Sequence, residues 1–145
     1  MYKHLLLPID GSPLSEIAIQ NTMRFAKSIN AKVTGFYVSP PYHALSLQME
    51  MLAETEDDFA KHSRVQAERL LGTIEDAASV AGVSCNTTYA IGAHPYEEII
   101  KAANDNGCDL ITMASHGRKG VKGLLLGSEA QKVLTHSKIP VLVYR

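Results

Sequence analysis

Residues 110–131 read LITMASHGRKGVKGLLLGSEAQ and contain the most informative pattern in the chain. The apolar run from Leu110 to Ala114 is typical of a strand that is covered on both faces of its sheet. Glycines then recur at every third position from Gly117 to Gly123, which indicates an irregular loop. Gly127-Ser128 is typical of a helix start. The stretch therefore predicts a buried strand, a glycine-rich loop and the first turn of a helix.

This loop and helix start suit an anion such as phosphate. Free N–H groups and the helix dipole at a first turn favour negative charge, and glycine lets a ligand approach the backbone. Arg118, Lys119 and Lys122 add positive charge nearby. A second interpretation needs no ligand, because Ser128 and Gln131 have the spacing of a capping box. The two interpretations are compatible, since a cap leaves other N–H donors free.

The rest of the chain alternates between strand and helix patterns. The expected strands are 3–9, 31–38, 84–91, 108–114 and 139–144, and the expected helices are 13–29, 57–81, 95–103 and 128–136. Residues 42–58 fit either a helix start or a loop over the site. The apolar face expected for the first helix consists of Leu14, Ile17, Ala18, Phe25 and Ile29.

This alternation predicts an α/β domain with a parallel sheet and right-handed crossovers. Ligands bind such sheets beyond the carboxyl ends of the strands, at the point where the strand order reverses. Asp10 follows the first strand and the glycine-rich loop follows the fourth, so we expect both features at one crevice. The alternative role of Asp10 is to cap the turn into the first helix. Pro140 places the last strand at a sheet edge, and an apolar edge strand (139–144) predicts a homodimer.

Composition limits the possible classes of protein. The 145 residues suffice for a hydrophobic core, and we expect one domain over 1–145. A net charge of −1 gives no general attraction to nucleic acid or to acidic membranes. No apolar run approaches the ~20 residues of a membrane helix, and the first residues lack a signal-peptide pattern. Cys85 and Cys108 are too few for a disulfide framework, so we expect buried thiols and a cytoplasmic protein.

Several chemistries lack their motifs. There is no Walker A sequence, no G-x-G-x-x-G after the first strand and no H-E-x-x-H. A serine-hydrolase elbow would need glycine where Met113 stands, and its helix would follow at once, whereas ten residues separate Gly117 from Ser128. No pair of carboxylates presents itself as acid and base, so no catalytic residue and no metal ligand is predicted.

Several separate segments point to one known family. Residues 6–12 read LLPIDGS, Ile91-Gly92 form a turn, and residues 137–143 read SKIPVLV. Residues 114–128 have the spacing G-x2-G-x9-G-[ST], with Ala114 in the place of the first glycine. On these residues, and over essentially its full length, the chain resembles the universal stress protein family in its single-domain, ATP-binding branch.

The resemblance implies a fold and a function. The fold is a Rossmann-like, three-layer α/β/α sandwich of the adenine nucleotide alpha hydrolase-like type. Its five-stranded parallel sheet has the order 3-2-1-4-5. The function is binding of ATP, ADP or AMP, with Mg²⁺ as a candidate bridge between phosphates, in a regulatory stress-response role and not as an enzyme. The resemblance also implies a dimer that pairs through the last strand.

The resemblance also assigns residues to the nucleotide. The adenosine should be bordered by Pro8, Ile9, Asp10, Val38, Met113 and Ala114. The phosphates should receive backbone N–H groups from Gly117, Gly127, Ser128 and Glu129. Arg118 and Lys119 are added for their charge alone. Two rival functions remain open: slow ATP hydrolysis or adenylyl transfer, for which H-x-G-H is absent, and a protein-interaction module that lost its ligand through Ala114.

Overall fold

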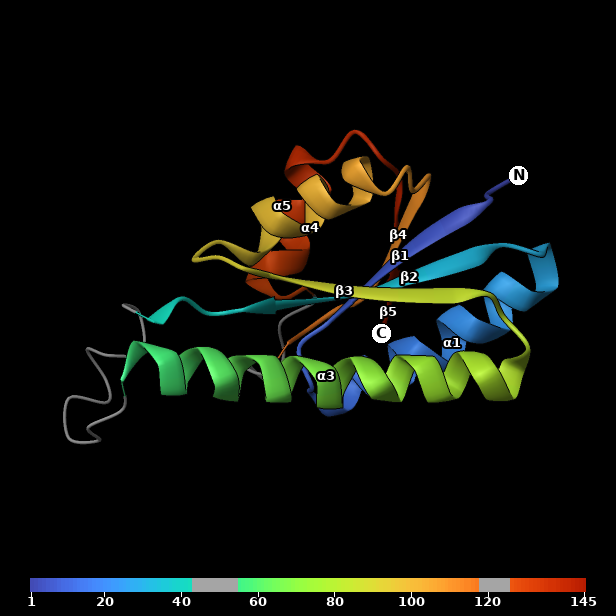
Figure 1. Ribbon diagram of the computed structural model, residues 1–145. Helices are drawn as coiled ribbons and strands as arrows, with labels where there is room; N and C mark the ends of the chain where they lie inside the picture. The colour runs from blue at the N-terminus through green and yellow to red at the C-terminus, as the bar shows by residue number, and fades with distance from the viewer. Residues whose placement is uncertain (43–54, 118–125) are drawn as a thin grey trace.

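The computed structural model describes residues 1–42, 55–117 and 126–145. Strands and helices alternate along these segments (Figure 1). The strands are β1 (His4–Ile9), β2 (Lys32–Ser39), β3 (Cys85–Ile91), β4 (Leu110–Ala114) and β5 (Val141–Tyr144). The helices are α1 (Pro13–Ile29), α3 (Glu56–Ala81), α4 (Pro95–Asp105) and α5 (Ser128–His136). Each element expected from the sequence is present, with ends shifted by a few residues.

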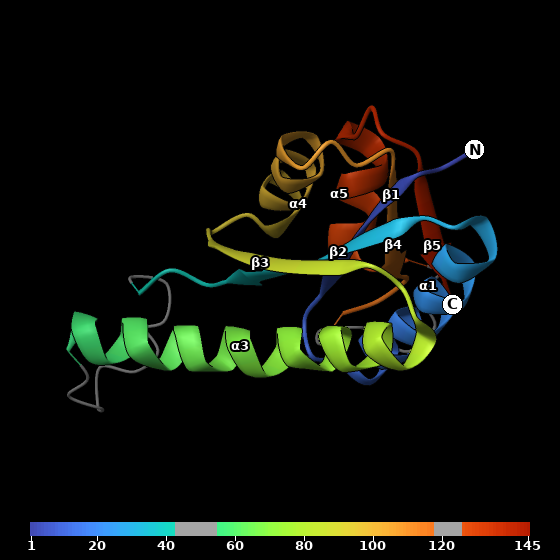
Figure 2. The same ribbon diagram turned by 45° about the vertical axis from the view of Figure 1, so that its right-hand side comes forward.

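The strands form one parallel sheet in the order β3-β2-β1-β4-β5. Helices α1 and α3 cover one face and α4 and α5 cover the other, so the molecule has three layers (Figures 1 and 2). A separate cluster of buried apolar residues fills each side of the sheet. The predicted α/β/α sandwich, its strand order and the edge position of β5 are confirmed.

Local sequence signals explain where α1 begins and ends. The Ser12 hydroxyl accepts the Ser15 N–H at 3.3 Å, and Pro13 occupies the first helical turn. Asn30 ends the helix with a left-handed φ of 55°. The expected apolar face was wrong in one respect, because the Ile17 side chain is 47% exposed. The buried residues of the helix, most of them small, are Ser15, Ala18, Ile19, Thr22, Met23 and Ala26.

The two ladders beside the central strand differ in length. The β1–β2 ladder has six residue pairs, from His4–Lys32 to Ile9–Tyr37. Among the described residues the β1–β4 ladder has two pairs, Leu5–Leu110 and Leu6–Ile111. Strands β1 and β4 are therefore joined by hydrogen bonds near their amino ends, and their carboxyl ends continue beyond the ladder.

Pro8 gives a physical reason for this short ladder. The Lys3 carbonyl accepts from β2 through Lys32, and the next residue, His4, accepts from Asp109 on the β4 side. Alternate residues of a strand face alternate neighbours, so even-numbered Pro8 faces β4. Proline has no N–H and cannot donate a ladder bond there. The carboxyl ends of β1 and β4 are thereby left without this connection.

Gly35 lets the longest helix approach the sheet. A Cβ atom at this β2 position would lie 2.7 Å from Cδ1 of Ile74, a fully buried residue of α3. It would also lie 3.2 Å from Cγ2 of Thr87 on β3. The close approach of α3 to β2 therefore requires glycine at this position.

Two further findings concern the helices and the thiols of the described residues. None of their helices is long and apolar enough to cross a lipid bilayer. Cys108 is buried and Cys85 half-buried, and both thiols are free. Burial raises the pKa of the Cys108 thiol to about 11, so this thiol stays protonated at neutral pH.

We expect Gly35→Ala to lower the free energy of unfolding by about 1–3 kcal/mol, because the new methyl group overpacks the core against Ile74. Gly72→Ala is the matched control. Gly72 lies within α3, and its added Cβ would meet no atom within 4 Å. Better helix propensity should then raise stability by about 1 kcal/mol. Urea denaturation of both variants measures the two changes, and equal effects would refute the packing account.

Candidate functional site

The turn after β1 is organised by the Asp10 carboxylate. Its Oδ1 accepts the Ser12 N–H at 2.9 Å and the Ser15 hydroxyl at 2.7 Å. The Asp10 N–H donates back to the Ser15 hydroxyl oxygen at 3.2 Å. The predicted capping role of Asp10 is therefore confirmed. These contacts hold one carboxylate oxygen in the turn and direct the other toward the chain that leaves β4.

Gly117 lies against that second oxygen. A Cβ atom on Gly117 would collide with Oδ2 of Asp10. The chain after β4 can thus reach the end of β1 only because this residue has no side chain. Gly117 is itself exposed to solvent. Two features separated by more than a hundred residues of sequence meet here, at the carboxyl edge of the sheet.

Gly127 makes a second close contact with the same segment. Its N–H donates to the Ser115 carbonyl oxygen at 2.6 Å. A Cβ atom on Gly127 would lie 3.2 Å from both that oxygen and Cα of His116, which is tighter than an ordinary contact. The residues before 118 and after 125 are therefore held together, and the start of α5 lies beside the end of β4.

The first turn of α5 has no side-chain cap. The N-cap residue is Gly127, and Ser128 is the first helical residue. The expected capping box between Ser128 and Gln131 does not form, because a Ser hydroxyl caps only from the N-cap position. Gln131 instead donates its side-chain N–H to the Leu126 carbonyl at 3.2 Å. The N–H groups of the first turn keep their capacity to bind an anion.

The model of the universal stress protein family matches residues 1–145. The chain belongs to the universal stress protein family. Universal stress protein MJ0531 of Methanocaldococcus jannaschii is 31% identical over 145 residues, covering 100% of this chain and 83% of that protein. The solved structure of MJ0577, from the same organism, has a TM-score of 0.83 at 31% identity and covers 99% of this chain and 95% of its own.

Two more distant universal stress proteins have the same fold and were solved with a nucleotide. One, in complex with cAMP, has a TM-score of 0.67 at 23% identity and covers 99% of this chain and 97% of its own. The other, from Archaeoglobus fulgidus in complex with dAMP, has a TM-score of 0.69 at 14% identity, with 100% and 98% covered. Both likenesses concern the fold.

The residues assigned to the adenosine by resemblance end three neighbouring strands of this universal stress protein. Pro8 and Ile9 end β1 and Asp10 follows it, Val38 lies near the end of β2, and Met113 and Ala114 end β4. The side chains of Ile9 and Met113 are each 7% exposed and belong to the core. Val38 and Ala114 are half-buried at the edge. Arg118, Lys119 and Lys122, like residues 43–54, lie outside the described residues.

Three side chains at this edge were missed by sequence reasoning. Ser15 holds the Asp10 carboxylate, and its position three residues after the N-cap was a usable signal. Ser115 donates or accepts through its hydroxyl with Nδ1 of His116 at 2.9 Å, and it is only 3% exposed. Glu129 was assigned for its N–H alone, yet its carboxylate accepts the Tyr96 N–H at 2.9 Å. No sequence pattern connects Glu129 with Tyr96.

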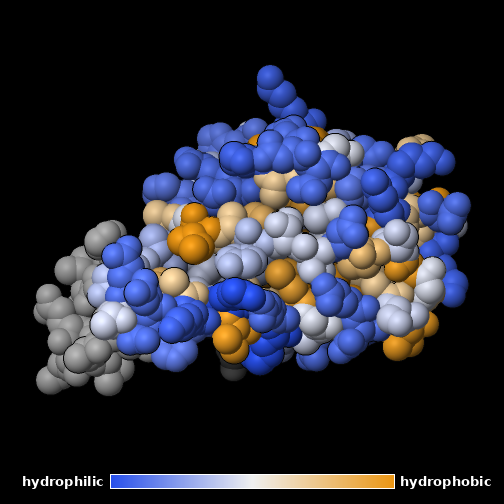
Figure 3. Space-filling model, viewed as in Figure 1, coloured by the Kyte–Doolittle hydropathy of each residue, from blue (hydrophilic) through white to orange (hydrophobic). Residues whose placement is uncertain are grey.

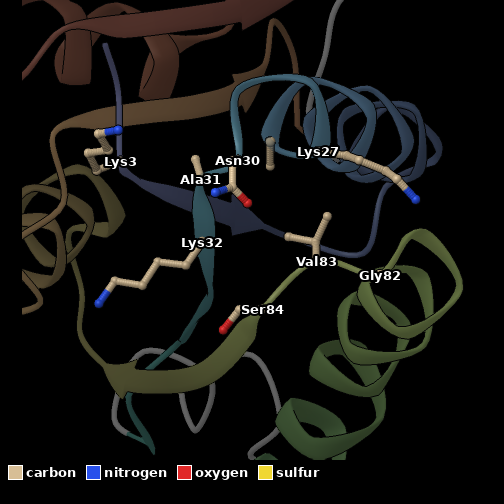
Figure 4. Close-up of a pocket in the computed structure, with 9 residues that line it drawn as sticks. Lys3, Lys27, Asn30, Ala31, Lys32, Gly82, Val83 and Ser84 are labelled. Carbon is tan, nitrogen blue, oxygen red and sulfur yellow. The ribbon is translucent and has the colours of Figure 1, made fainter.

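A hollow of about 560 Å³ lies at the opposite edge of the sheet, at the amino ends of β1, β2 and β3. Its wall includes Lys3, Lys27 and Lys32, which suggests an anion site on charge alone. Lys27 and Lys32 extend in opposite directions (Figure 4). The Lys27 ammonium already donates to the Ala81 carbonyl at 2.7 Å. These cations do not converge on a common point, so the carboxyl edge remains the candidate site.

We expect Gly117→Ala to lower the free energy of unfolding by about 1–3 kcal/mol, because the new methyl group overlaps the Asp10 carboxylate. A double-mutant cycle with Asp10→Ala isolates this contact. In the Asp10→Ala background the same change at Gly117 should cost less than about 0.5 kcal/mol. Urea denaturation of the four proteins gives the coupling, and additive effects would contradict the close approach.

Proposed function

We propose that this universal stress protein binds an adenine nucleotide, ATP, ADP or AMP, at the carboxyl edge of its sheet. The observation that carries the proposal is the uncapped first turn of α5 beside Gly117. Such a turn presents N–H donors and a positive dipole end to an anion. The exposed Ser128 hydroxyl adds a further donor.

In this proposal one group of residues binds the phosphates of the nucleotide and another binds the adenosine. The N–H groups of Gly117, Gly127, Ser128 and Glu129 serve the phosphates, although that of Gly127 first has to leave the Ser115 carbonyl. Arg118 supplies positive charge. The adenosine is bordered by the strand ends, namely Pro8, Ile9, Asp10, Val38, Met113 and Ala114. Because Ile9 and Met113 are core residues, they act mainly through their backbone and through the shape of the edge.

The solved relatives support a nucleotide over other anions. The distant relatives solved with cAMP and dAMP are universal stress proteins with this fold. Ala114 keeps a small side chain where the family motif has glycine, and it is packed partly against the core. No group of three potential metal ligands occurs among the described residues. A magnesium ion would therefore be bound chiefly by phosphate oxygens and water, as Mg²⁺ prefers.

The role we propose is regulatory, within one domain formed by residues 1–145 and in the cytoplasm. Universal stress proteins are generally regulatory, and the free thiols of Cys85 and Cys108 suit a reducing compartment. Ser115 is only 3% exposed, so its hydroxyl is poorly placed to meet a substrate as a nucleophile. The rival functions are slow ATP hydrolysis and a protein-interaction module without nucleotide.

We expect acid extraction of the purified protein, followed by chromatography, to release an adenine nucleotide. Titration calorimetry with ATP and AMP then gives their affinities. Gly127→Val should weaken ATP at least about tenfold, because the side chain presses on Ser115 and His116 and moves the N–H groups of the first turn. A melting temperature near that of the wild type is required for this comparison. Affinity unchanged in the folded variant would remove the phosphate role of α5.

We also propose a homodimer that pairs through residues 139–144, which are β5 and the two residues before it. β5 is an edge strand whose four residues are all half-buried, so it offers both backbone groups and apolar surface. The face that β3 and α3 present is less suitable, because its apolar side chains are separate spots on a largely hydrophilic surface (Figure 3).

Sedimentation equilibrium at micromolar concentration should give twice the mass of one chain. Val141→Lys should shift the equilibrium to the monomer, because a charged edge strand resists pairing. Val80→Lys is the control, since Val80 is 91% exposed and lies on α3 at the opposite end of the sheet. A monomeric wild type, or equal effects of both lysines, would refute this interface.

A further inference from the structure

The side chain of Glu129 connects the first turn of α5 to a different helix. Its Oε2 accepts the backbone N–H of Tyr96 at 2.9 Å. Tyr96 belongs to the first turn of α4, where His94 is the N-cap residue and makes no side-chain cap. Glu129 therefore supplies, from 33 residues away, the cap that α4 lacks in its own sequence.

The connection has a second part on the same helix. The Lys132 ammonium lies 3.3 Å from the other carboxylate oxygen of Glu129. The same ammonium lies 5.6 Å from the centre of the Tyr96 ring. The centre of the His136 ring lies 5.3 Å from the centre of the Tyr96 ring. Three successive turns of α5 thus contact the start of α4. The first of these contacts is made by Glu129, which lies in the turn whose N–H groups form the proposed phosphate site.

The carboxylate of Glu129 creates an electrostatic problem that this geometry solves. An acidic side chain in the first turn of a helix is favoured by the dipole and competes with any bound anion for the same positive end. Here the carboxylate is directed to the start of α4, which is also a positive dipole end, and it is paired with Lys132. The first turn of α5 is left to an external anion.

We propose that Glu129 is a positioning residue for the phosphate site: its carboxylate binds the Tyr96 N–H and so fixes the orientation of the first turn of α5. This inference rests on the proposed nucleotide function and deepens it. In this proposal the Glu129 side chain contributes to binding of the phosphates and does not contribute to binding of the base.

The test compares two variants with the same charge. Glu129→Gln keeps an oxygen that accepts the Tyr96 N–H, whereas Glu129→Ala removes it. Glu97→Ala is a further control, because it removes another carboxylate from the first turn of α4. The Glu97 carboxylate accepts a hydrogen bond from the Tyr96 hydroxyl and none from the Tyr96 N–H. Titration calorimetry measures ATP and adenosine binding to each variant and to the wild type.

We expect Glu129→Ala to bind ATP about five- to tenfold more weakly than Glu129→Gln, the usual loss for one well-formed hydrogen bond. Adenosine should bind both variants equally, because it has no phosphate. Glu97→Ala should bind ATP like the wild type. Amide exchange at Tyr96 should be faster in Glu129→Ala than in Glu129→Gln, which tests the hydrogen bond without a ligand.

Three results would overturn the inference. One is equal ATP affinity for Glu129→Ala and Glu129→Gln, and another is a parallel loss of ATP and adenosine, which would indicate general damage. The third is Tyr96 exchange that does not differ between the two variants. If the wild type binds neither ATP nor AMP, the proposed function fails and this inference fails with it. If the wild type binds ATP and the two variants agree, the inference alone fails.

Discussion

The hydrogen bond from the Gly127 N–H to the Ser115 carbonyl is the contact that brings the end of β4 and the start of α5 together before a phosphate binds. At 2.6 Å it joins the end of β4 to the start of α5 across residues 118–125. It sets where the first turn of α5 points, and it keeps Gly127 too close to His116 for a side chain. Gly117, three residues after Ala114, is held against Asp10 by the same arrangement. Two glycines therefore let three elements meet at one edge of the sheet.

Much of the fold was predictable because its signals are local. Alternating apolar periods located the strands and helices, Ser12 and Asn30 marked the ends of α1, and Pro140 marked an edge strand. The strand order and the motif spacing came from the resemblance to a family and not from periodicity. The buried face of α1 was predicted less well. Apolar spacing favoured Ile17, whereas the approach of helix and sheet selected small residues such as Ala18 and Ala26.

The site was less predictable than the fold because its contacts are not local. The spacing of Ser128 and Gln131 suggested a capping box, but the backbone starts the helix one residue earlier and uses Gly127 as the N-cap. A side chain that caps its own helix has a sequence pattern. Glu129 caps a different helix, and no spacing announces such a partner. The capping role of Asp10 was visible because its partners follow within five residues.

Pro8 makes the centre of the sheet unequal along its length. Near its amino end, β1 has ladder hydrogen bonds to both β2 and β4. Near its carboxyl end, β1 is paired, among the described residues, with β2 alone. The part of β1 that is bonded on both sides and the part at the proposed site are thus separate along the same strand. A small rotation of β4 together with its partner β5 would change the spacing at the carboxyl end of β1 without breaking a ladder bond between β1 and β4. The missing N–H of one proline thus leaves the spacing of these two strand ends to contacts such as that of Asp10 with Gly117, and not to the ladder.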